Sequence, residues 1–418
     1  MLDWGTQVVV IGSGPAGLMA AAVAAGQGAA VTLLEALPAP GRKLLASGAG
    51  KCNFTNMLSA EAMADRFAPE QRRFVRPALL NFTPEMTRKF FRKHGVGHKL
   101  VDDFYCFPAS EKASDILNVF LKIFNDYNVQ VICGEEVSAI EIQSGLITAV
   151  RTVNNNIYPC DYLIAAGGGP GFPRLGARGS LDKHIQKCEI AVVSRTPALC
   201  GLKCRDNWLE DLSGIVLEDV AVELDKKNSS AGTLLFTGEG ISGPAALDMA
   251  GRAAKLLAGK CKDVQLKINF LPDISQQDWL DFWNQQRQIN GKRLIYNLLS
   301  SKMPTALAKA LTTLSGAGEC IAAQLNKSMT GALITNLTAC PITVYATESW
   351  DKSMASTGGV ARTEINANTM QSKRISNLYF AGEFIDVDGP CGGYNIQWAL
   401  SSGYLAGSLK SKKLCFQS

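Results

Sequence analysis

Two segments of the chain have glycines at the spacing GxGxxG, which is typical of loops that bind the phosphates of a dinucleotide. The first is "GSGPAG" at residues 12–17, and the second is "GEGISG" at residues 238–243. Such a loop suits a pyrophosphate because bare backbone can approach the ligand and a following helix N-terminus favours anions. The spacing alone predicts one or two nucleotide sites, so the surrounding elements must decide between them.

The first segment has every element of a dinucleotide-binding fold in order. Four apolar residues, Val8 to Ile11, predict a buried strand, and an alanine-rich helix is expected from Pro15 to about Ala25. The segment "AVTLLE" predicts a second strand that ends at Glu35, where a carboxylate can accept hydrogen bonds from a ribose. We therefore expect a dinucleotide here, with Gly12 for the tight turn, Gly14 for pyrophosphate approach and Gly17 for helix–strand packing.

The second segment lacks this context. A strand "TLLF" precedes it and a helix can begin at Pro244, but Gly251 interrupts that helix. The next strand, "VQLKINF", ends without an acid, and Asp273 lies thirty residues beyond Gly243, where about twenty is expected. We expect no second nucleotide domain, and instead a turn at residues 238–243 that helps to shape the substrate pocket.

Four other segments favour FAD over NAD as the bound dinucleotide. Residues 41–56, "GRKLLASGAGKCNFTN", predict a loop too irregular for a helix or strand, which can accommodate the flavin end of FAD. Residues 160–171 predict a strand ending in glycines, and "TGGV" at 357–360 predicts a turn over the flavin. Residues 377–407 predict a strand, an acid-bearing turn, a glycine pair and a helix, whose N-terminus would stabilise negative charge on reduced flavin.

Most residues expected to bind FAD lie in these segments or in the first glycine motif and the strand that follows it, and Val137 is added to them. The full set is Gly12, Gly14, Pro15, Ala16, Gly17, Glu35, Ala36, Arg42, Lys43, Ser47, Gly48, Gly50, Lys51, Cys52, Asn53, Val137, Ala166, Gly167, Gly168, Gly358, Gly382, Glu383, Asp388, Gly393, Tyr394, Asn395, Ile396 and Gln397.

The segments at 41–56 and 378–404, together with "FPASEKASDIL" and "TGEGISGPAAL", closely resemble the BaiN/RdsA-type family of bacterial FAD-dependent oxidoreductases. The resemblance covers nearly the whole chain. It implies an FAD domain built from both chain ends, around an inserted region with a β-rich part and a helical part. It also implies reduction of carbon–carbon double bonds, in steroid-like bile acid derivatives or in a uridine of ribosomal RNA, and one related enzyme is an amine oxidase. The chain departs from the family pattern at Gly238 and at residues 167–184, which puts the substrate in doubt.

The expected chemistry is hydride transfer from flavin to an electron-poor alkene, with a nearby acid protonating the other carbon. NADH or NADPH would be the transient electron donor. The candidate catalytic residues are Tyr394, Glu239, Arg174 and Arg362. A disulfide reductase is disfavoured because the flavin loop holds a single cysteine, Cys52.

Three function classes stay open. A reductase of a small-molecule alkene comes first. A flavoenzyme that modifies RNA comes second, with the lysines and arginines of residues 66–93 as its basic face, although these would more often be a solvated helical surface. An oxidase of small amines, which would need no nicotinamide, comes third.

Composition agrees with a globular oxidoreductase of several domains. The chain has 418 residues and a net charge of +5, which suits an anionic cofactor but is too weak to indicate nucleic acid by itself. Twelve cysteines without a CxxC pair, together with three histidines, predict reduced thiols and no metal site. With no apolar run of about eighteen residues and no signal peptide expected, we predict a cytoplasmic protein that does not span a membrane. Nothing in the sequence indicates the oligomeric state.

The expected fold class is α/β, with a Rossmann-like FAD domain at residues 1–194 and 351–418. The inserted region is expected to have a β-rich part at 195–258, a helical part at 259–328 and a β-rich return at 329–350. Alternation in "GIVLEDVAVELD" predicts an antiparallel strand, and residues 276–314 predict amphipathic helices with a break near Pro304.

Overall fold

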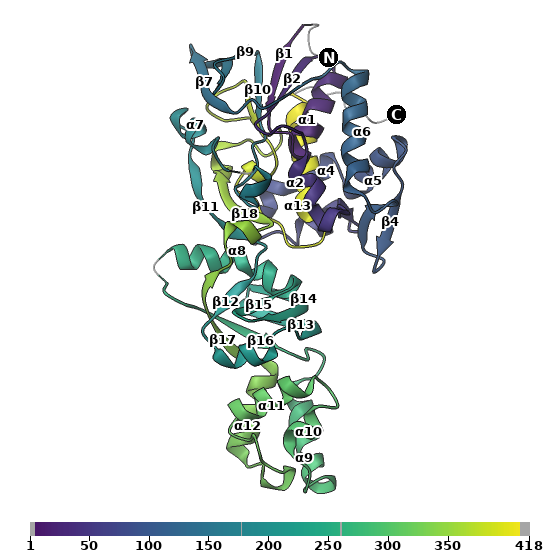
Figure 1. Ribbon diagram of the computed structural model, residues 1–418, viewed down its shortest axis with the longest axis vertical. Coiled ribbons are helices and arrows are strands. Elements are labelled where there is room, and N and C mark those ends of the chain that lie inside the picture. The colour runs from purple at the N-terminus through teal and green to yellow at the C-terminus, as the bar shows by residue number, and fades with distance from the viewer. Residues whose placement is uncertain (1–4, 177, 260, 410–418) are drawn as a thin grey trace. The chain divides into compact units, whose positions relative to one another are not determined.

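The computed structural model describes residues 5–176, 178–259 and 261–409 (Figure 1). The chain divides into two compact units, which are described separately. Unit 1 contains residues 1–195 and 355–418, and unit 2 contains residues 196–354. The expected outer boundaries, after residues 194 and 350, lie close to these two cuts.

Unit 1 is built on a five-stranded parallel sheet. Its strand order is β19-β10-β1-β2-β6. The strands are β1 (Gln7–Ile11), β2 (Ala30–Glu35), β6 (Gln130–Cys133), β10 (Tyr162–Ala165) and β19 (Leu378–Phe380). Since all neighbours pair in parallel, the carboxyl ends of the five strands lie along one edge. Ligands of such sheets bind outside that edge.

Two buried helices join the ends of the chain. They are α1 (Pro15–Gly26), in purple, and α13 (Tyr394–Gly407), in yellow (Figure 1). A Cβ atom at Gly403 would collide with the carbonyl oxygen of Ala16, and one at Gly407 would lie 2.5 Å from that of Ala20. The two helices pack closely because α13 has glycines where it faces α1. Strand β1 and strand β19 therefore belong to one domain although they lie at opposite ends of the chain.

The rest of unit 1 surrounds this sheet. A β-meander forms the three-stranded sheet β7-β8-β9, and another small sheet has the order β3-β5-β4. The strands of these sheets are β3 (Thr55–Asn56), β4 (His98–Val101), β5 (Tyr105–Pro108), β7 (Val137–Gln143), β8 (Leu146–Thr152) and β9 (Ile157–Pro159). The helices are α2 (Arg42–Ala46), α3 (Ala60–Ala64), α4 (Pro69–Asn81), α5 (Pro84–Lys93), α6 (Ala113–Asp126) and α7 (Asp182–Lys187). Strands β11 (Val192–Ala198) and β18 (Ala355–Val360) pair where the chain passes between the units.

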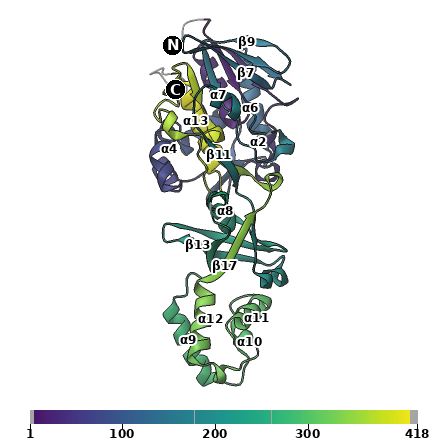
Figure 2. The ribbon, with the colours of Figure 1, turned by 90° about the vertical axis from the view of Figure 1, so that its left-hand side faces the viewer.

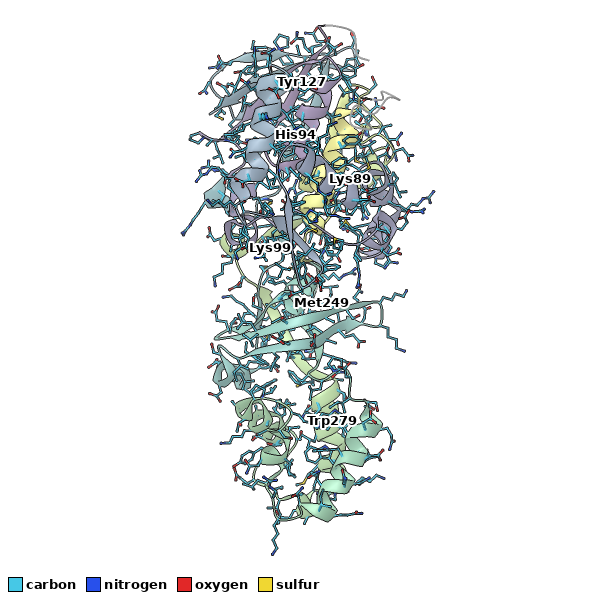
Figure 3. All side chains as sticks on the ribbon, turned by 90° about the vertical axis from the view of Figure 1, so that its right-hand side faces the viewer. Lys89, His94, Lys99, Tyr127, Met249 and Trp279 are labelled. Atoms are coloured by element: carbon cyan, nitrogen blue, oxygen red, sulfur yellow. The ribbon has the colours of Figure 1, made fainter. Side chains whose placement is uncertain are left out.

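Unit 2 contains a closed antiparallel barrel with the order β12-β15-β14-β13-β16-β17. The strands are β12 (Leu202–Cys204), β13 (Val216–Asp225), β14 (Asn228–Thr237), β15 (Gly240–Ser242), β16 (Val264–Asn269) and β17 (Cys340–Thr347). Between β16 and β17 the chain forms the helices α9 (Gln276–Ile289), α10 (Ile295–Leu299), α11 (Thr305–Leu314) and α12 (Lys327–Thr338). Figure 2 shows these four helices gathered beyond one end of the barrel. Trp279 of α9 is fully buried among them (Figure 3).

The barrel explains why the second glycine motif is no dinucleotide fold. Strand β14, which precedes Gly238, pairs antiparallel with β13 and β15, whereas a dinucleotide fold needs a parallel strand there. A Cβ at Gly240 would collide with the carbonyl oxygen of Leu202 in β12, and one at Gly243 would lie 2.7 Å from that of Thr233. These two glycines are required where strands and a helix approach each other. The expectation that Gly251 interrupts the helix after Pro244 is wrong. Gly251 is a buried residue in the middle of the continuous helix α8 (Pro244–Ala258).

The predicted α/β class, with a Rossmann-like domain from both chain ends, is confirmed, but several local predictions are wrong. Residues 41–56 are not irregular throughout, because Arg42–Ala46 form helix α2 and Thr55–Asn56 form strand β3. "TGGV" is part of strand β18, although Gly358 and Gly359 have the positive φ values of 79° and 122° that glycine permits.

The inner boundaries of the inserted region also differ from the expected ones. Strand β16 pairs with β13 and β17, so it belongs to the barrel and not to the helical part. Helix α12 packs against α9 and α11, so the helical part extends beyond residue 328.

Candidate functional site

The loop between β1 and α1 has the geometry of a phosphate-binding turn. Gly12 has φ 96°, and a Cβ there would lie 2.5 Å from the carbonyl oxygen of Ala166. A Cβ at Gly17 would collide with the carbonyl oxygen of Gly12, so this glycine lets α1 pack against the turn. Gly14 is the N-cap of α1 and has no side chain with which to cap the first-turn amides. Those amides can therefore bind an anionic ligand.

The carboxylate of Glu35 lies at the end of β2, beside this loop. Its Oε2 accepts hydrogen bonds from the backbone N–H of Ser13, at 3.0 Å, and from the hydroxyl of Ser13, and its Oε1 accepts one from the N–H of Leu37 at 3.0 Å. The Ser13 oxygen also accepts from the N–H of Gly41 at 3.1 Å. Oε2 thus has both lone pairs engaged, while Oε1 keeps one, so the oriented side chain can still accept from one ribose hydroxyl. Ser13 could not be singled out in advance, since it stands at one of the unspecified positions of the glycine motif.

A pocket opens along this carboxyl edge of the sheet. Its lining includes residues expected to bind FAD, and they are Gly12, Gly14, Glu35, Ala36, Arg42, Lys43, Val137, Ala166, Gly167 and Gly168. The lining also includes a segment not expected to bind the cofactor, within the stretch 167–184 that departs from the family pattern, with Leu175, Gly176, Arg178, Gly179, Ser180 and Leu181. We call residues 172–176 and 178–181 the strap. A Cβ at Gly176 would collide with the side chain of Leu37, so the strap packs directly against the residues that follow Glu35.

An ion pair lies next to the phosphate loop. Nζ of Lys43 lies 2.8 Å from Oε2 of Glu383, while Oε1 of Glu383 accepts from the N–H and hydroxyl of Ser356 at 2.8 and 2.9 Å. Burial by itself would raise the pKa of Glu383, but Lys43, Ser356 and Arg195 together hold that pKa below its ordinary value. Glu383 is therefore a carboxylate at neutral pH. Its neighbour Gly382 has φ 68° and lies against α1.

The flavin loop of the sequence is held mainly by its own contacts. The hydroxyl of Ser47 donates to the carbonyl of Leu44 at 2.6 Å, and Gly48 has φ 55°. Lys51 pairs with Glu111 at 3.1 Å. In the amide orientation that satisfies both contacts, Asn53 donates to the carbonyls of Thr55 and Cys106 at 2.8 and 3.2 Å.

Cys52 is fully buried in this loop. Burial raises the pKa of its thiol to about 12, although a hydrogen bond with Ser47 opposes the shift. The side chain is therefore a neutral thiol at physiological pH, which makes it a poor nucleophile or redox partner. This agrees with the expectation that the chain is no disulfide reductase.

The N-terminus of α13 lies against the same loop. A Cβ at Gly393 would lie 2.7 Å from the carbonyl oxygen of Thr55, and Asn56 donates to the carbonyl of Gly392 at 3.0 Å. Gly393 is the N-cap and offers no capping side chain, so the first-turn amides of α13 can also bind a polar group. Tyr394 begins the helix, is 5% exposed, and packs edge-to-face on Phe67.

Three of the expected cofactor residues near α13 use their side chains within the protein. Asn395 exchanges hydrogen bonds with the backbone of Gly389 at 2.8 Å in both directions. Gln397 is fully buried and donates to the carbonyl of Phe82 at 3.0 Å, and Asp388 accepts from Gln71 at 2.9 Å. Their side chains position the backbone of the site, while Ile396 lies in the first turn of α13.

The other candidate catalytic residues have different surroundings. Arg362 donates to the carbonyl of Glu70 and lies 3.6 Å from Asp386, so it ties α4 to the C-terminal segment. Arg174 lies exposed in the strap. Glu239, in unit 2, pairs with Lys203 at 2.7 Å, and the hydrogen bond with Lys203 lowers its pKa. Glu239 is thus a carboxylate at neutral pH and lacks the proton that a general acid must donate.

A continuous series of contacts connects these parts of unit 1. It runs from the Glu35 pocket through the phosphate loop to Gly382 and Glu383, and then through Lys43 to the flavin loop and Gly393. The N-termini of α1 and α13 both belong to this series, and neither has a capping side chain. Within the described residues, no helix is both long and apolar enough to cross a membrane.

Comparison with known proteins places the chain among relatives of nearly equal length. A family model described as "HI0933-like protein Rossmann domain" matches residues 6–409. The chain is 31% identical over 402 residues to "Ribosomal RNA dihydrouridine synthase" of Escherichia coli, covering 95% of this chain and 96% of that protein. The protein of the same name from Haemophilus influenzae gives the same identity and coverage. The chain is also 28% identical over 414 residues to "3-dehydro-bile acid delta(4,6)-reductase" of Clostridium scindens, covering 97% and 99% of the two chains.

Proposed function

Because the chain belongs to the HI0933-like Rossmann family of FAD-dependent oxidoreductases, we propose that it reduces a carbon–carbon double bond of a small molecule, with NADH or NADPH as electron donor. The observation that carries the cofactor part is the Lys43–Glu383 pair, which joins the two halves of the FAD domain beside the phosphate loop. The relative named as a bile acid reductase supports the alkene part.

Each part of unit 1 has a role in this proposal. The α1 N-terminus binds the pyrophosphate, Glu35 accepts from the adenosine ribose, and the α13 N-terminus stabilises negative charge on the reduced flavin. FAD, when bound, would supply the hydride-transfer chemistry between the nicotinamide and one alkene carbon. Tyr394 donates the proton to the other carbon, because it is buried at the start of α13, while Glu239 is ionised.

The test is anaerobic stopped-flow of the purified yellow protein with NADH and with NADPH. Rapid bleaching of the flavin absorbance supports a reductase, and reoxidation by an electron-poor enone then supports the alkene step. If neither nucleotide bleaches the flavin while a small amine does, the chain is an amine oxidase and the proposal fails.

A second candidate, reduction of a uridine in RNA, is favoured by a basic surface on α4 and α5. Residues 60–100 contain nine lysines and arginines against four acids. Arg73, Arg76 and Lys89 are exposed there (Lys89 is labelled in Figure 3), whereas Arg88 donates to the carbonyl of Asn56 at 2.7 Å. The relatives named as ribosomal RNA dihydrouridine synthases support this candidate.

Salt dependence distinguishes the two substrate classes. If the substrate is RNA, binding to ribosomal RNA fragments weakens steeply with salt, and R73Q/R76Q lowers the slope of log affinity against log salt by about two. If it is a small molecule, R73Q/R76Q leaves enone reduction unchanged.

A further inference from the structure

Arg195 is a buried cation in strand β11 of unit 1. Its side chain is 6% exposed and donates to acceptors from three separate parts of the fold. A buried guanidinium is retained only where its charge is neutralised and its donors are satisfied. The partners of Arg195 therefore show which segments it fixes in place.

On one side Arg195 holds the end of the strap. Its Nε and Nη2 donate to Oδ2 and Oδ1 of Asp182, at 2.6 and 2.9 Å, in a two-pronged pair. Asp182 begins helix α7, directly after Leu181, the last residue of the strap. Leu181 in turn packs on Gly167, where a Cβ would lie 3.0 Å from its Cδ2. The ion pair thus anchors the end of the strap, which lines the pocket together with Glu35.

On the other side Arg195 holds the turn that carries Glu383. Nη1 donates to the carbonyl of Glu383 at 3.1 Å and, in longer contacts of 3.4 Å, to the carbonyl of Gly358 and the hydroxyl of Ser356. Nη2 also donates to the carbonyl of Phe384 at 3.3 Å. Ser356 donates to the carboxylate of Glu383, so Arg195 helps to position that carboxylate through Ser356.

We propose that Arg195 is a positioning residue for the cofactor. It holds the strap, which lines the adenosine pocket, and the Glu383 turn in fixed positions, so that the two form one rigid binding surface. This inference rests on the proposed binding of FAD to unit 1. The fork of the guanidinium is essential, because one planar group reaches the carboxylate and the carbonyls at once. A lysine ammonium keeps the charge but cannot span both sides.

The test uses R195M, R195K and D182N, with R151M as the control. Arg151 pairs with Glu141 at 2.7 Å in the same unit, on strands β8 and β7, and neither residue lines the pocket. For each protein we would measure the dissociation constant and release rate of FAD at 15 °C, by the recovery of flavin fluorescence. We would also measure the melting temperature without FAD and the rise in melting temperature when FAD is added.

R195M should bind FAD at least about tenfold more weakly than the wild type, in line with the loss of charged hydrogen bonds. The FAD affinity of R195K should lie between those of R195M and the wild type. D182N should release FAD faster than the wild type, with an unchanged absorption spectrum. The FAD-induced rise in melting temperature should shrink for all three, since that rise reports binding to the folded state alone. R151M should lower only the melting temperature of the apoprotein.

Several outcomes would overturn the inference. Wild-type FAD affinity in R195M would mean that Arg195 only stabilises the fold, and wild-type affinity in R195K would mean that its charge suffices without the fork. An unchanged release rate in D182N would remove the strap from the proposal. If the wild-type protein itself bound no FAD, the proposed function would fail before Arg195 was tested.

Discussion

Lys43 and Glu383 are 340 residues apart in the sequence, yet Nζ of one lies 2.8 Å from Oε2 of the other. Their side chains are 27% and 23% exposed, so water screens the pair only in part. Lys43 stands in α2 and Glu383 follows β19, so the pair links the two segments of unit 1 that the insertion separates in the sequence.

Replacing Lys43 with Met should make FAD binding sensitive to acid. A carboxyl group whose pKa is lowered on folding stabilises the protein fully above its unfolded pKa, about 4.3, and this contribution is lost as the pH falls through the folded value. Without Lys43 the burial of Glu383 is less well opposed, so its pKa rises. Flavin release on acid titration should therefore begin at a higher pH in K43M. Coincident titration curves for K43M and the wild type would show that the pair does not control retention.

Substitutions at Gly14 and Gly17 should have different effects, because G14V should lose the cofactor while G17V should lose stability. A Cβ at Gly14 meets no described atom within 4 Å, and its φ of −69° suits any residue, so G14V should fold normally but exclude the pyrophosphate. The purified variant should be colourless with a near-normal apoprotein melting temperature. In G17V the Cβ collides with the carbonyl of Gly12, so this variant should be destabilised as a protein. A yellow G14V would place the phosphates elsewhere.

Glu35→Gln should weaken FAD binding about tenfold, the loss expected for one or two hydrogen bonds to neutral hydroxyls. The matched control is S13A, which removes the hydroxyl that orients Glu35 but leaves its charge. S13A should also weaken FAD binding, but by less than E35Q does. Equilibrium titration of the apoproteins with FAD measures both, and wild-type affinity in E35Q would mean that the ribose is bound by other groups.

The parts of this site that the sequence predicted are those with local patterns. The β1–α1–β2 unit follows from an apolar run, a glycine turn and an acid that stand within thirty residues of one another. The strap has neither helical nor strand periodicity, so the sequence marked it only as a departure from the family pattern and not as part of the cofactor pocket. Arg195 is separated by 161 to 189 residues from Ser356, Gly358, Glu383 and Phe384, and its contacts exist only once the units of the chain are folded.

The wrong local predictions have tertiary causes. Five residues are too few to predict a helix, but α2 packs on α6 and is stabilised there. The glycine pair in β18 suggested a turn, yet both glycines lie in a strand where neighbouring backbone is too close for a side chain. A Cβ at Gly359 would lie 2.5 Å from the carbonyl oxygen of Phe384.

Tyr394→Phe should separate the two half-reactions. Flavin reduction by the nicotinamide needs no proton from Tyr394, so its rate should be unchanged. Reoxidation by the alkene should slow by about 10² to 10⁴, the usual contribution of a general acid. The control is Y162F, which changes a tyrosine of strand β10 whose ring packs on that of Tyr379. Equal reoxidation rates for Y394F and the wild type would assign the proton to another donor.

Gly240→Val should retain FAD, because Gly240 belongs to the barrel of unit 2. The new side chain would collide with the carbonyl of Leu202 and strain the β12–β15 pairing, so turnover and the stability of unit 2 should fall. G238A is the control, since a Cβ there meets no described atom within 4 Å. Turnover lost in G238A without loss of stability would assign the turn directly to the substrate pocket. Flavin content as low in G240V as in G14V would reinstate a second nucleotide site.

The packing of α13 on α1 also has a consequence for synthesis of the protein. The ribosome completes β1, α1, β2 and the barrel before it makes Gly403 and Gly407, the residues that let the last helix lie on the first. Because domains fold as their residues emerge, unit 2 can form on the nascent chain while unit 1 still lacks β19, Glu383 and α13. Capture of the flavin therefore cannot precede the synthesis of α13, and a chain interrupted between β17 and β19 would carry a folded barrel but no colour.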